Sequence, residues 1–184
     1  MASIKHRFHR MLVLATTVGV AAILGGCSTL EVGRAPAIEP GAKWALLPFV
    51  NQTETPQAGL RAESIAESLL RASGISNLKR YPSTLATETL FEPMDRKQFD
   101  AALVWARGEN IKYAIAGGVD EWRYKVGIDG EPAAGVALQL IDVQTGAVLW
   151  SGSGGSTGWS RESLSGVAQK LIAKLLQPVL SAAR

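Results

Sequence analysis

Apolar residues at helical spacing predict three amphipathic helices in this chain. In the first, over residues 58–73, Leu60, Ile65 and Leu69 fall on one stripe, and Gly74 is placed to end the helix. The second is expected over residues 95–107. The third is expected to run from a cap at Ser160 to about residue 180.

Shorter apolar runs between these helices predict strands over residues 43–50, 77–81, 111–126, 136–143 and 147–152. The last two strands are joined by the tight turn Gln144-Thr145-Gly146 and form a hairpin. The resulting order is β-α-β-α-β-β-β-α. This order is typical of the α/β class, here an α+β sandwich in which helices pack on one mixed sheet.

The longest predicted strand changes its pattern half-way. One face is apolar as far as Val119, but charged residues continue that face after Asp120, while Trp122 and Tyr124 continue the other. The two faces of a regular strand point to opposite sides of the sheet, so the apolar residues before and after Asp120 cannot enter the same core. Either a bulge at Gly117-Gly118 restores the pattern within one monomer, or the strand runs past its core and Trp122 and Tyr124 pack on a neighbouring copy.

The first 26 residues have a composition of their own. Lys5, Arg7 and Arg10 precede an apolar run of about 14 residues, which is shorter than the ~20 that a membrane-crossing helix needs. The segment Leu24-Gly25-Gly26-Cys27 follows and resembles a bacterial lipobox, whose cysteine receives diacylglycerol. We therefore expect a signal peptide over residues 1–26 and a lipid anchor, with palmitate among its acyl chains, on Cys27.

The residues after this cysteine suggest a location and a domain boundary. Pro36, Pro40 and a lack of periodicity predict a lipidated tether over residues 27–42, followed by a single periplasmic domain over residues 43–184. In lipoproteins, an aspartate directly after the cysteine retains the protein in the inner membrane. Ser28 therefore indicates the periplasmic face of the outer membrane.

Composition excludes several functions. Without the leader, 16 basic residues balance 16 acidic ones, so the chain lacks the basic excess of a nucleic-acid-binding protein. Both histidines lie in the leader, and Cys27 is the only cysteine. This excludes Ser-His-Asp and Cys-His catalysis and the usual zinc sites. We expect no cofactor and no metal.

Four acidic residues cluster around the end of the longest strand: Asp120, Glu121, Asp129 and Glu131. Adjacent residues of a regular strand point to opposite faces, so Asp120 and Glu121 do not form a glycosidase pair there. The stretch is either a solvated hairpin tip or an acidic patch that becomes a ring of charge when the chain oligomerises.

Trp150 and Trp159 flank a glycine-rich segment over residues 152–158. This segment lacks the Gly-Lys-Ser/Thr ending of a phosphate-binding loop, and its small residues favour either close approach of a neighbour or a mobile loop. The two indoles either pack beneath the last helix or reach the headgroup layer of a membrane, where indole is favoured.

Several segments resemble known lipoproteins. Residues 44–53 (Trp-Ala-Leu-Leu-Pro-Phe-Val-Asn-Gln-Thr) and residues 138–151 resemble the domain of CsgG- and LpoB-type lipoproteins. More narrowly, residues 55–59, 119–122, 127–132 and 158–163 resemble the PelC family, outer-membrane lipoproteins of the Pel exopolysaccharide system. The likeness covers roughly residues 43 to 176.

The resemblance to PelC implies a homo-oligomeric ring, a dodecamer, against the inner leaflet of the outer membrane. It also implies an acidic funnel that guides a cationic, partly deacetylated amino-sugar polymer to the export porin PelB for the biofilm matrix. Asp120, Glu121, Asp129 and Glu131 are then candidates for polysaccharide contacts. Asp120 comes first, because it is expected to share a strand face with Trp122. Trp150 and Trp159 are candidates for membrane contact.

Two other functions compete with this non-enzymatic export role. An LpoB-like lipoprotein would regulate a cell-wall synthase, but such proteins usually have longer tethers. The roughly 15 residues here reach ~50 Å at most. A glycoside hydrolase that uses only carboxylates is the remaining alternative.

Overall fold

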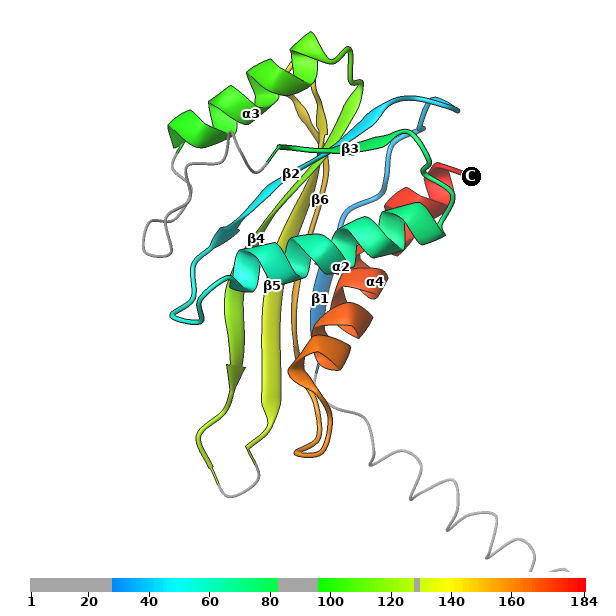
Figure 1. Cartoon of the computed structure of the whole chain (residues 1–184). Helices are drawn as coiled ribbons and strands as arrows, with labels where there is room; N and C mark the ends of the chain where they lie inside the picture. The colour runs from blue at the N-terminus through cyan, green and yellow to red at the C-terminus, as the bar shows by residue number, and fades with distance from the viewer. Residues whose placement is uncertain (1–27, 83–95, 128–129) are drawn as a thin grey trace, which may run out of the picture.

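The computed structural model describes residues 28–82, 96–127 and 130–184, and its elements follow the predicted order with one strand added at the start (Figure 1). The leader, Cys27 and Asp129 lie outside the described residues. The added strand is β1 (Ser28–Val32). After it come β2 (Trp44–Asn51), α2 (Ala58–Ala72), β3 (Leu78–Arg80), α3 (Arg96–Gly108), β4 (Tyr113–Tyr124), β5 (Pro132–Asp142), β6 (Val148–Thr157) and α4 (Leu164–Ala182).

The strands form one mixed sheet in the order β1-β6-β5-β4-β2-β3. Strand β2 is parallel to its neighbours β3 and β4, and the other pairs are antiparallel. Parallel neighbours need a crossover connection, which α2 supplies between β2 and β3. Short turns suffice for the antiparallel pairs β4–β5 and β5–β6. The predicted α+β architecture with a mixed sheet is confirmed.

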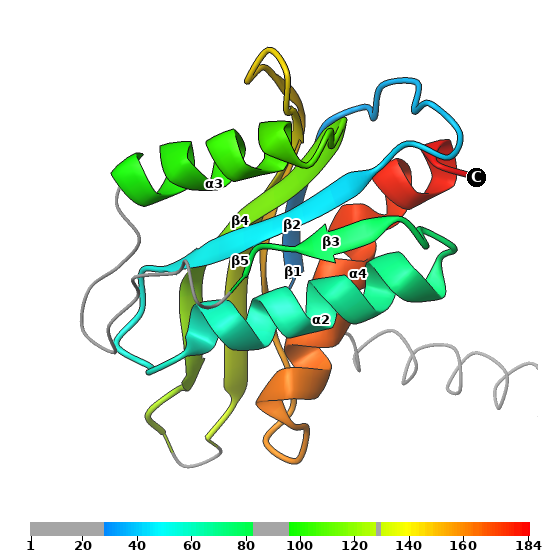
Figure 2. The same cartoon turned by 45° about the horizontal axis from the view of Figure 1, so that its top comes forward.

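Helices lie on both faces of the sheet, but they cover them unequally (Figures 1 and 2). The larger core lies beneath α2 and α4 and contains Trp44, Phe49 and Leu171. The smaller core lies beneath α3 and contains Ala114 and Ile141. Along β5 this second core stops at Ile141, so the rest of that face is left without a described helix over it.

Strand β1 corrects the expectation of a loose tether. Ser28–Val32 pair antiparallel with β6, from Ser28 opposite Ser156 to Val32 opposite Gly152. The glycines of β6 permit this pairing, because a Cβ on Gly154 would lie 2.6 Å from the carbonyl oxygen of Thr29. The glycine-rich segment is therefore mostly a strand rather than a mobile loop.

A one-residue bulge in β4 explains the pattern change. Val119 lies opposite Val136 and Glu121 lies opposite Gly135, so Asp120 is the extra residue. The bulge lies at Asp120 and not at Gly117-Gly118. It reverses the alternation, so Val119 and Trp122 enter the same core at 0% and 2% exposure. Trp122 thus packs within its own chain, and the expectation that Asp120 shares its face is wrong.

Several element boundaries differ from those predicted, among them the end of β6, which extends to Thr157 rather than residue 152, the start of α4 and the start of β5. Helix α4 is capped by Ser163, whose Oγ accepts a hydrogen bond from the Gly166 N–H at 3.1 Å, and not by Ser160. Strand β5 begins at Pro132, earlier than the predicted residue 136, because its small residues continue the ladder with β4 and β6.

A buried carboxylate joins α2 to the sheet. The pairing of β2 with β4 shifts register between Leu46 and Phe49, around Pro48, which has no N–H to donate. The Phe49 N–H donates instead to Glu63 Oε2 of α2 at 3.4 Å. Glu63 is 2% exposed, and Arg80 of β3 lies 2.5 Å from its other oxygen. The ion pair with Arg80 therefore offsets part of the free-energy cost of burying the Glu63 carboxylate away from water.

Arg80→Ala should lower the free energy of unfolding by about 2–4 kcal/mol, because it removes the Arg80 guanidinium that offsets the buried charge of Glu63. Arg71→Ala is the matched control, since Arg71 pairs with Glu67 on the exposed side of the same helix, and should cost under about 1 kcal/mol. Urea unfolding of both variants measures the difference. Equal losses would contradict this role of Arg80.

Candidate functional site

The uncovered part of the sheet beside α3 carries small and polar side chains, and we call it the open face. Its members are Thr29 and Glu31 of β1, Asp120, Glu121 and Arg123 of β4, Gly135, Ala137 and Gln139 of β5, and Ser151 and Ser153 of β6. The charged side chains of β1 and β4 are therefore longer than the glycine, alanine and serine side chains on the strands between them. Such a surface presents its carboxylates to solvent or to a ligand.

The bulge places Asp120 and Glu121 on this same face. A Cβ built on Gly135 would lie 3.3 Å from the Cβ of Glu121 and 3.7 Å from the Cβ of Asp120. Both side chains thus leave the backbone beside Gly135. The expectation that these two neighbours point to opposite faces is wrong, because it assumed a strand without a bulge.

The two carboxylates differ in their partners. Glu121 Oε1 accepts a hydrogen bond from Arg123 Nε at 2.9 Å, and this ion pair balances its charge. Asp120 is exposed, and its carboxylate has no ion pair or hydrogen bond within the described parts of the chain. Asp120 therefore supplies the uncompensated negative charge on this part of β4.

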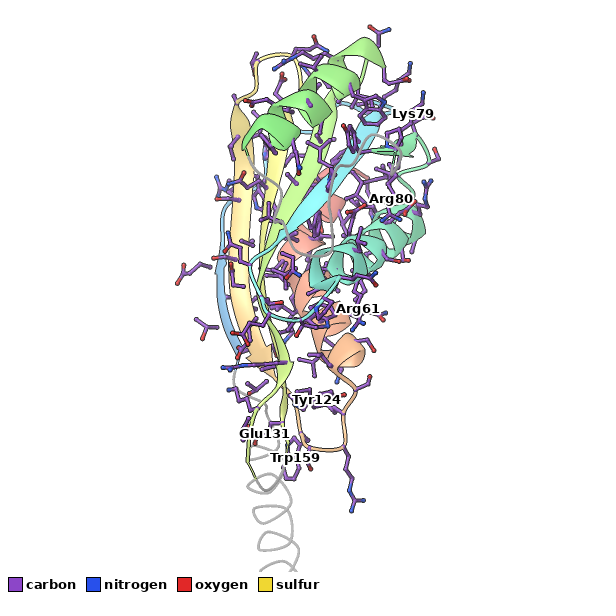
Figure 3. All side chains as sticks on the ribbon, turned by 60° about the vertical axis from the view of Figure 1, so that its left-hand side comes forward. Arg61, Lys79, Arg80, Tyr124, Glu131 and Trp159 are labelled. Carbon is purple, nitrogen blue, oxygen red and sulfur yellow. The ribbon has the colours of Figure 1, made fainter. Side chains whose placement is uncertain are left out.

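Glu131 and Glu31 lie apart from this pair. Glu131 is exposed in the β4–β5 turn (Figure 3). Its carbonyl oxygen accepts a hydrogen bond at 2.7 Å from the N–H of Lys125, which lies four residues after Glu121. Glu31 lies on β1 in register with Ser153. Sequence analysis misses Glu31 because the prolines and the lack of periodicity predict a tether there, although the alternation around Leu30 is a signal for a strand.

The two candidate membrane tryptophans have different environments. Trp150 is 3% exposed, and its indole N–H donates to the Gly33 carbonyl at 2.8 Å. Its ring occupies the space that a side chain at Gly152 would need. The structure thus corrects the expectation for Trp150, which is a core residue. Trp159 is 58% exposed in the β6–α4 loop and stays a candidate for membrane contact (Figure 3).

The loop that carries Trp159 is held by Glu162. The Trp159 N–H donates to Glu162 Oε2 at 3.0 Å, and Lys170 Nζ lies 2.5 Å from Glu162 Oε1. The hydrogen bond from Lys170, followed by that from the Trp159 backbone, holds the pKa of Glu162 below its ordinary value. The carboxylate therefore stays ionised and keeps the loop in place near neutral pH.

Comparison with solved structures identifies relatives of this fold. The PelC dodecamer from Paraburkholderia phytofirmans is 46% identical over 86% of this chain and 99% of its own, with a TM-score of 0.72. This chain belongs to the PelC family. A variant PelC dodecamer from that organism is 47% identical over 83% of this chain and 97% of its own, with a TM-score of 0.71.

A more distant structure agrees with the PelC family on the fold alone. Lipoprotein GNA1162 from Neisseria meningitidis is 17% identical over 76% of this chain and 99% of its own, with a TM-score of 0.51. A scan against protein-family models finds no match, and a search of the curated proteins finds none either.

The described residues of this PelC-family chain hold no cluster of three metal-ligating side chains. Within them, too, no helix combines the length and the apolar character required to cross a membrane. What the described site offers chemically is a set of exposed carboxylates on a sheet of small residues. Such a set attracts cations through the field that it creates.

In this PelC-family chain, Trp150→Ala should lower the free energy of unfolding by about 3–5 kcal/mol, because it empties a packed core position. Trp159→Ala is the matched control and should change the free energy of unfolding by less than about 0.5 kcal/mol, since the side chain is exposed. Tryptophan fluorescence during urea unfolding measures both. If the Trp150→Ala variant were as stable as the control, Trp150 would not be a core residue and would again be a candidate for membrane contact.

Proposed function

We propose that this chain is a lipid-anchored, non-enzymatic component of Pel exopolysaccharide export that forms a ring on the periplasmic face of the outer membrane. The observation that carries the proposal is its 46% identity to a PelC that assembles as a dodecamer. The Leu24-Gly25-Gly26-Cys27 motif supports it, because it predicts acylation of Cys27 at the end of a signal peptide.

A ring would turn modest single charges into a strong field. Two carboxylates contribute little alone, since a pair of charges 4 Å apart in water interacts by about 1 kcal/mol. A closed ring repeats each acidic side chain around one opening, where the fields add. Asp120 suits this role because it is exposed and unpaired within the described residues, whereas Arg123 offsets Glu121.

The ligand that such a ring attracts is a polycation. In the proposal, a partly deacetylated amino-sugar polymer passes the ring on its way to the porin PelB, and its ammonium groups meet Asp120, Glu121, Asp129 and Glu131. These contacts are long-range and non-covalent, so they guide the polymer without holding it. Salt should weaken them, because exposed charges are screened over about 8 Å at physiological ionic strength.

The start of β1 favours this role over that of an LpoB-like regulator. Such a regulator needs a long tether to reach a synthase across the cell-wall mesh. In this chain, β1 begins at Ser28, directly after Cys27. An anchor on Cys27 would therefore hold the folded domain against its own membrane.

Asp120→Asn should reduce the amount of exported polysaccharide several-fold, because it removes the unpaired carboxylate while keeping the side-chain shape. The matched control is Asp100→Asn, which neutralises an exposed acid on α3. Polysaccharide in the culture medium is measured against protein abundance and oligomer mass, which should stay constant in both variants.

Normal export by Asp120→Asn would shift the role to the neighbouring acids. Normal export after Asp120, Glu121, Asp129 and Glu131 are all neutralised would reject the funnel. A fall in export that equals that of the Asp100→Asn control would show a general effect of charge rather than a role for the open face.

A further inference from the structure

The loop between β2 and α2, residues 52–57, is a braced projection beside β4 (Figures 1 and 2). Asn51 organises it from the end of β2. Its Nδ2 donates to the Thr55 carbonyl at 2.9 Å, and its Oδ1 accepts from the Thr53 N–H at 3.1 Å and from the Thr53 hydroxyl at 2.8 Å. The Thr55 hydroxyl donates to the Trp122 carbonyl and fixes the loop to β4. A loop held in this way loses little conformational entropy when it binds a partner.

Glu54 gives this loop an unpaired negative charge. The residue is exposed, and its carboxylate has no ion pair or hydrogen bond within the described residues. Arg61, near the start of α2, is the next cation along the chain, and the structure shows no ion pair between the two. Pro56 is exposed on the same loop. The loop therefore presents one carboxylate and one apolar ring on a preformed support.

A groove of ≈ 440 Å³ lies at the opposite edge of the sheet, between β1, the end of β6 and the first half of α4. Val167 and Leu171 form its apolar floor, and Lys170 and Lys174 are exposed beside them on α4. Lys170 pairs with Glu162, which also lines the groove. The ammonium group of Lys174 has no ion pair or hydrogen bond within the described part of the chain, so the groove carries a net positive charge.

The loop and the groove lie at the same height along the strands. The loop is fixed to β4 at Trp122. Ser28, which lines the groove, is opposite Ser156 of β6. Ser156 is in turn opposite Ala134 of β5, and Ala134 is opposite Trp122. Three strand spacings, about 14 Å in all, separate β1 from β4 at this height. The negative loop and the positive groove therefore flank the sheet on its two sides.

A closed ring joined head to tail requires such a pair of surfaces. One rotation generates all the copies, so each interface joins one surface of a copy to a different surface of the next. Rotation leaves the height along the axis unchanged, so the two surfaces must also lie at one height. The loop and the groove meet both conditions for an axis that runs along β4, β5 and β6.

We propose that the loop of each copy inserts into the groove of the next copy, with Glu54 against Lys174 of its neighbour. Pro56 then faces the apolar floor formed by Val167 and Leu171. Opposite charges on the two surfaces fix the register of the contact and disfavour pairing of two loops or of two grooves. The inference rests on the proposed ring and assigns the surfaces that close it.

Reversing either charge tests the contact. The leaderless chain, residues 28–184, contains every described element, and the PelC of the solved structure aligns with 86% of this chain along 99% of its own length. Sedimentation of a dilution series gives the concentration at which half of the chain is assembled. Glu54→Lys and Lys174→Glu should each raise this concentration at least about tenfold, because each places like charges in contact.

Mixing the two variants tests whether the charges meet between copies. In a ring with an even number of copies, such as the dodecamer of the related PelC, the two variants can alternate. Every loop then faces a groove of opposite charge. An equimolar mixture should therefore assemble within about threefold of the wild-type concentration, since the favourable pairing is restored at every interface. A defect in folding would not be repaired in this way.

Two reversals elsewhere are the matched controls. Asp100→Lys changes an exposed acid on α3, and Arg184→Glu changes an exposed cation beyond the end of α4. Neither should alter assembly. If circular dichroism shows that a reversed variant is unfolded, Glu54→Gln and Lys174→Ala take its place, each with an expected increase of about threefold in the assembly concentration.

The outcomes separate this interface from the ring itself. A wild-type chain that stays monomeric would reject both. A wild-type ring that the reversed variants form at the same concentration would reject the contact between loop and groove and keep the ring. Equal losses in the control variants, or no recovery when the two variants are mixed, would also overturn the contact. Loss in each variant with recovery in the mixture is the result that we expect.

Discussion

The extra residue in β4 determines what each face of the sheet carries. With Asp120 inserted opposite no partner residue, Val119 and Trp122 both enter the core beneath α2 and α4. The same insertion sends Asp120 and Glu121 to the open face, above the small residue Gly135. Without the bulge, one of two outcomes would follow: a buried charge or an exposed tryptophan, each costly. The core and the acidic face of this PelC-family chain therefore depend on one local irregularity.

The glycines of β6 have a comparable effect on the N-terminal segment. They let β1 approach the sheet edge and let the Trp150 ring lie over Gly152. The segment after Cys27 is consequently part of the fold, and the position of a lipid on that cysteine would set the orientation of the whole domain. The acidic open face and β1 then belong to the same sheet, which an assembly would repeat in register.

Sequence analysis predicted the element order and the pattern change near Asp120, because these follow from apolar periodicity. Its apolar stripe for the first helix was wrong, since α2 buries Ala62, Ala66 and Leu70 and leaves Leu60 41% exposed. It misplaced the bulge, since Gly117-Gly118 is the usual local signal, whereas the register with β5 decides the position. It took residues 28–42 for a tether because proline and glycine obscure a short strand whose partner lies far along the chain. Burial of Trp150 depends on Gly33 and Gly152, and no local pattern reveals that contact.

Assembly into a closed ring is the central claim, because the funnel depends on repeating one carboxylate around a shared opening. Native mass spectrometry of the leaderless chain, residues 28–184, in the absence of lipid tests this claim most directly. The account predicts a single large species close to twelve chain masses, in line with the dodecamer of the related PelC. A strictly monomeric chain at tens of micromolar would contradict it.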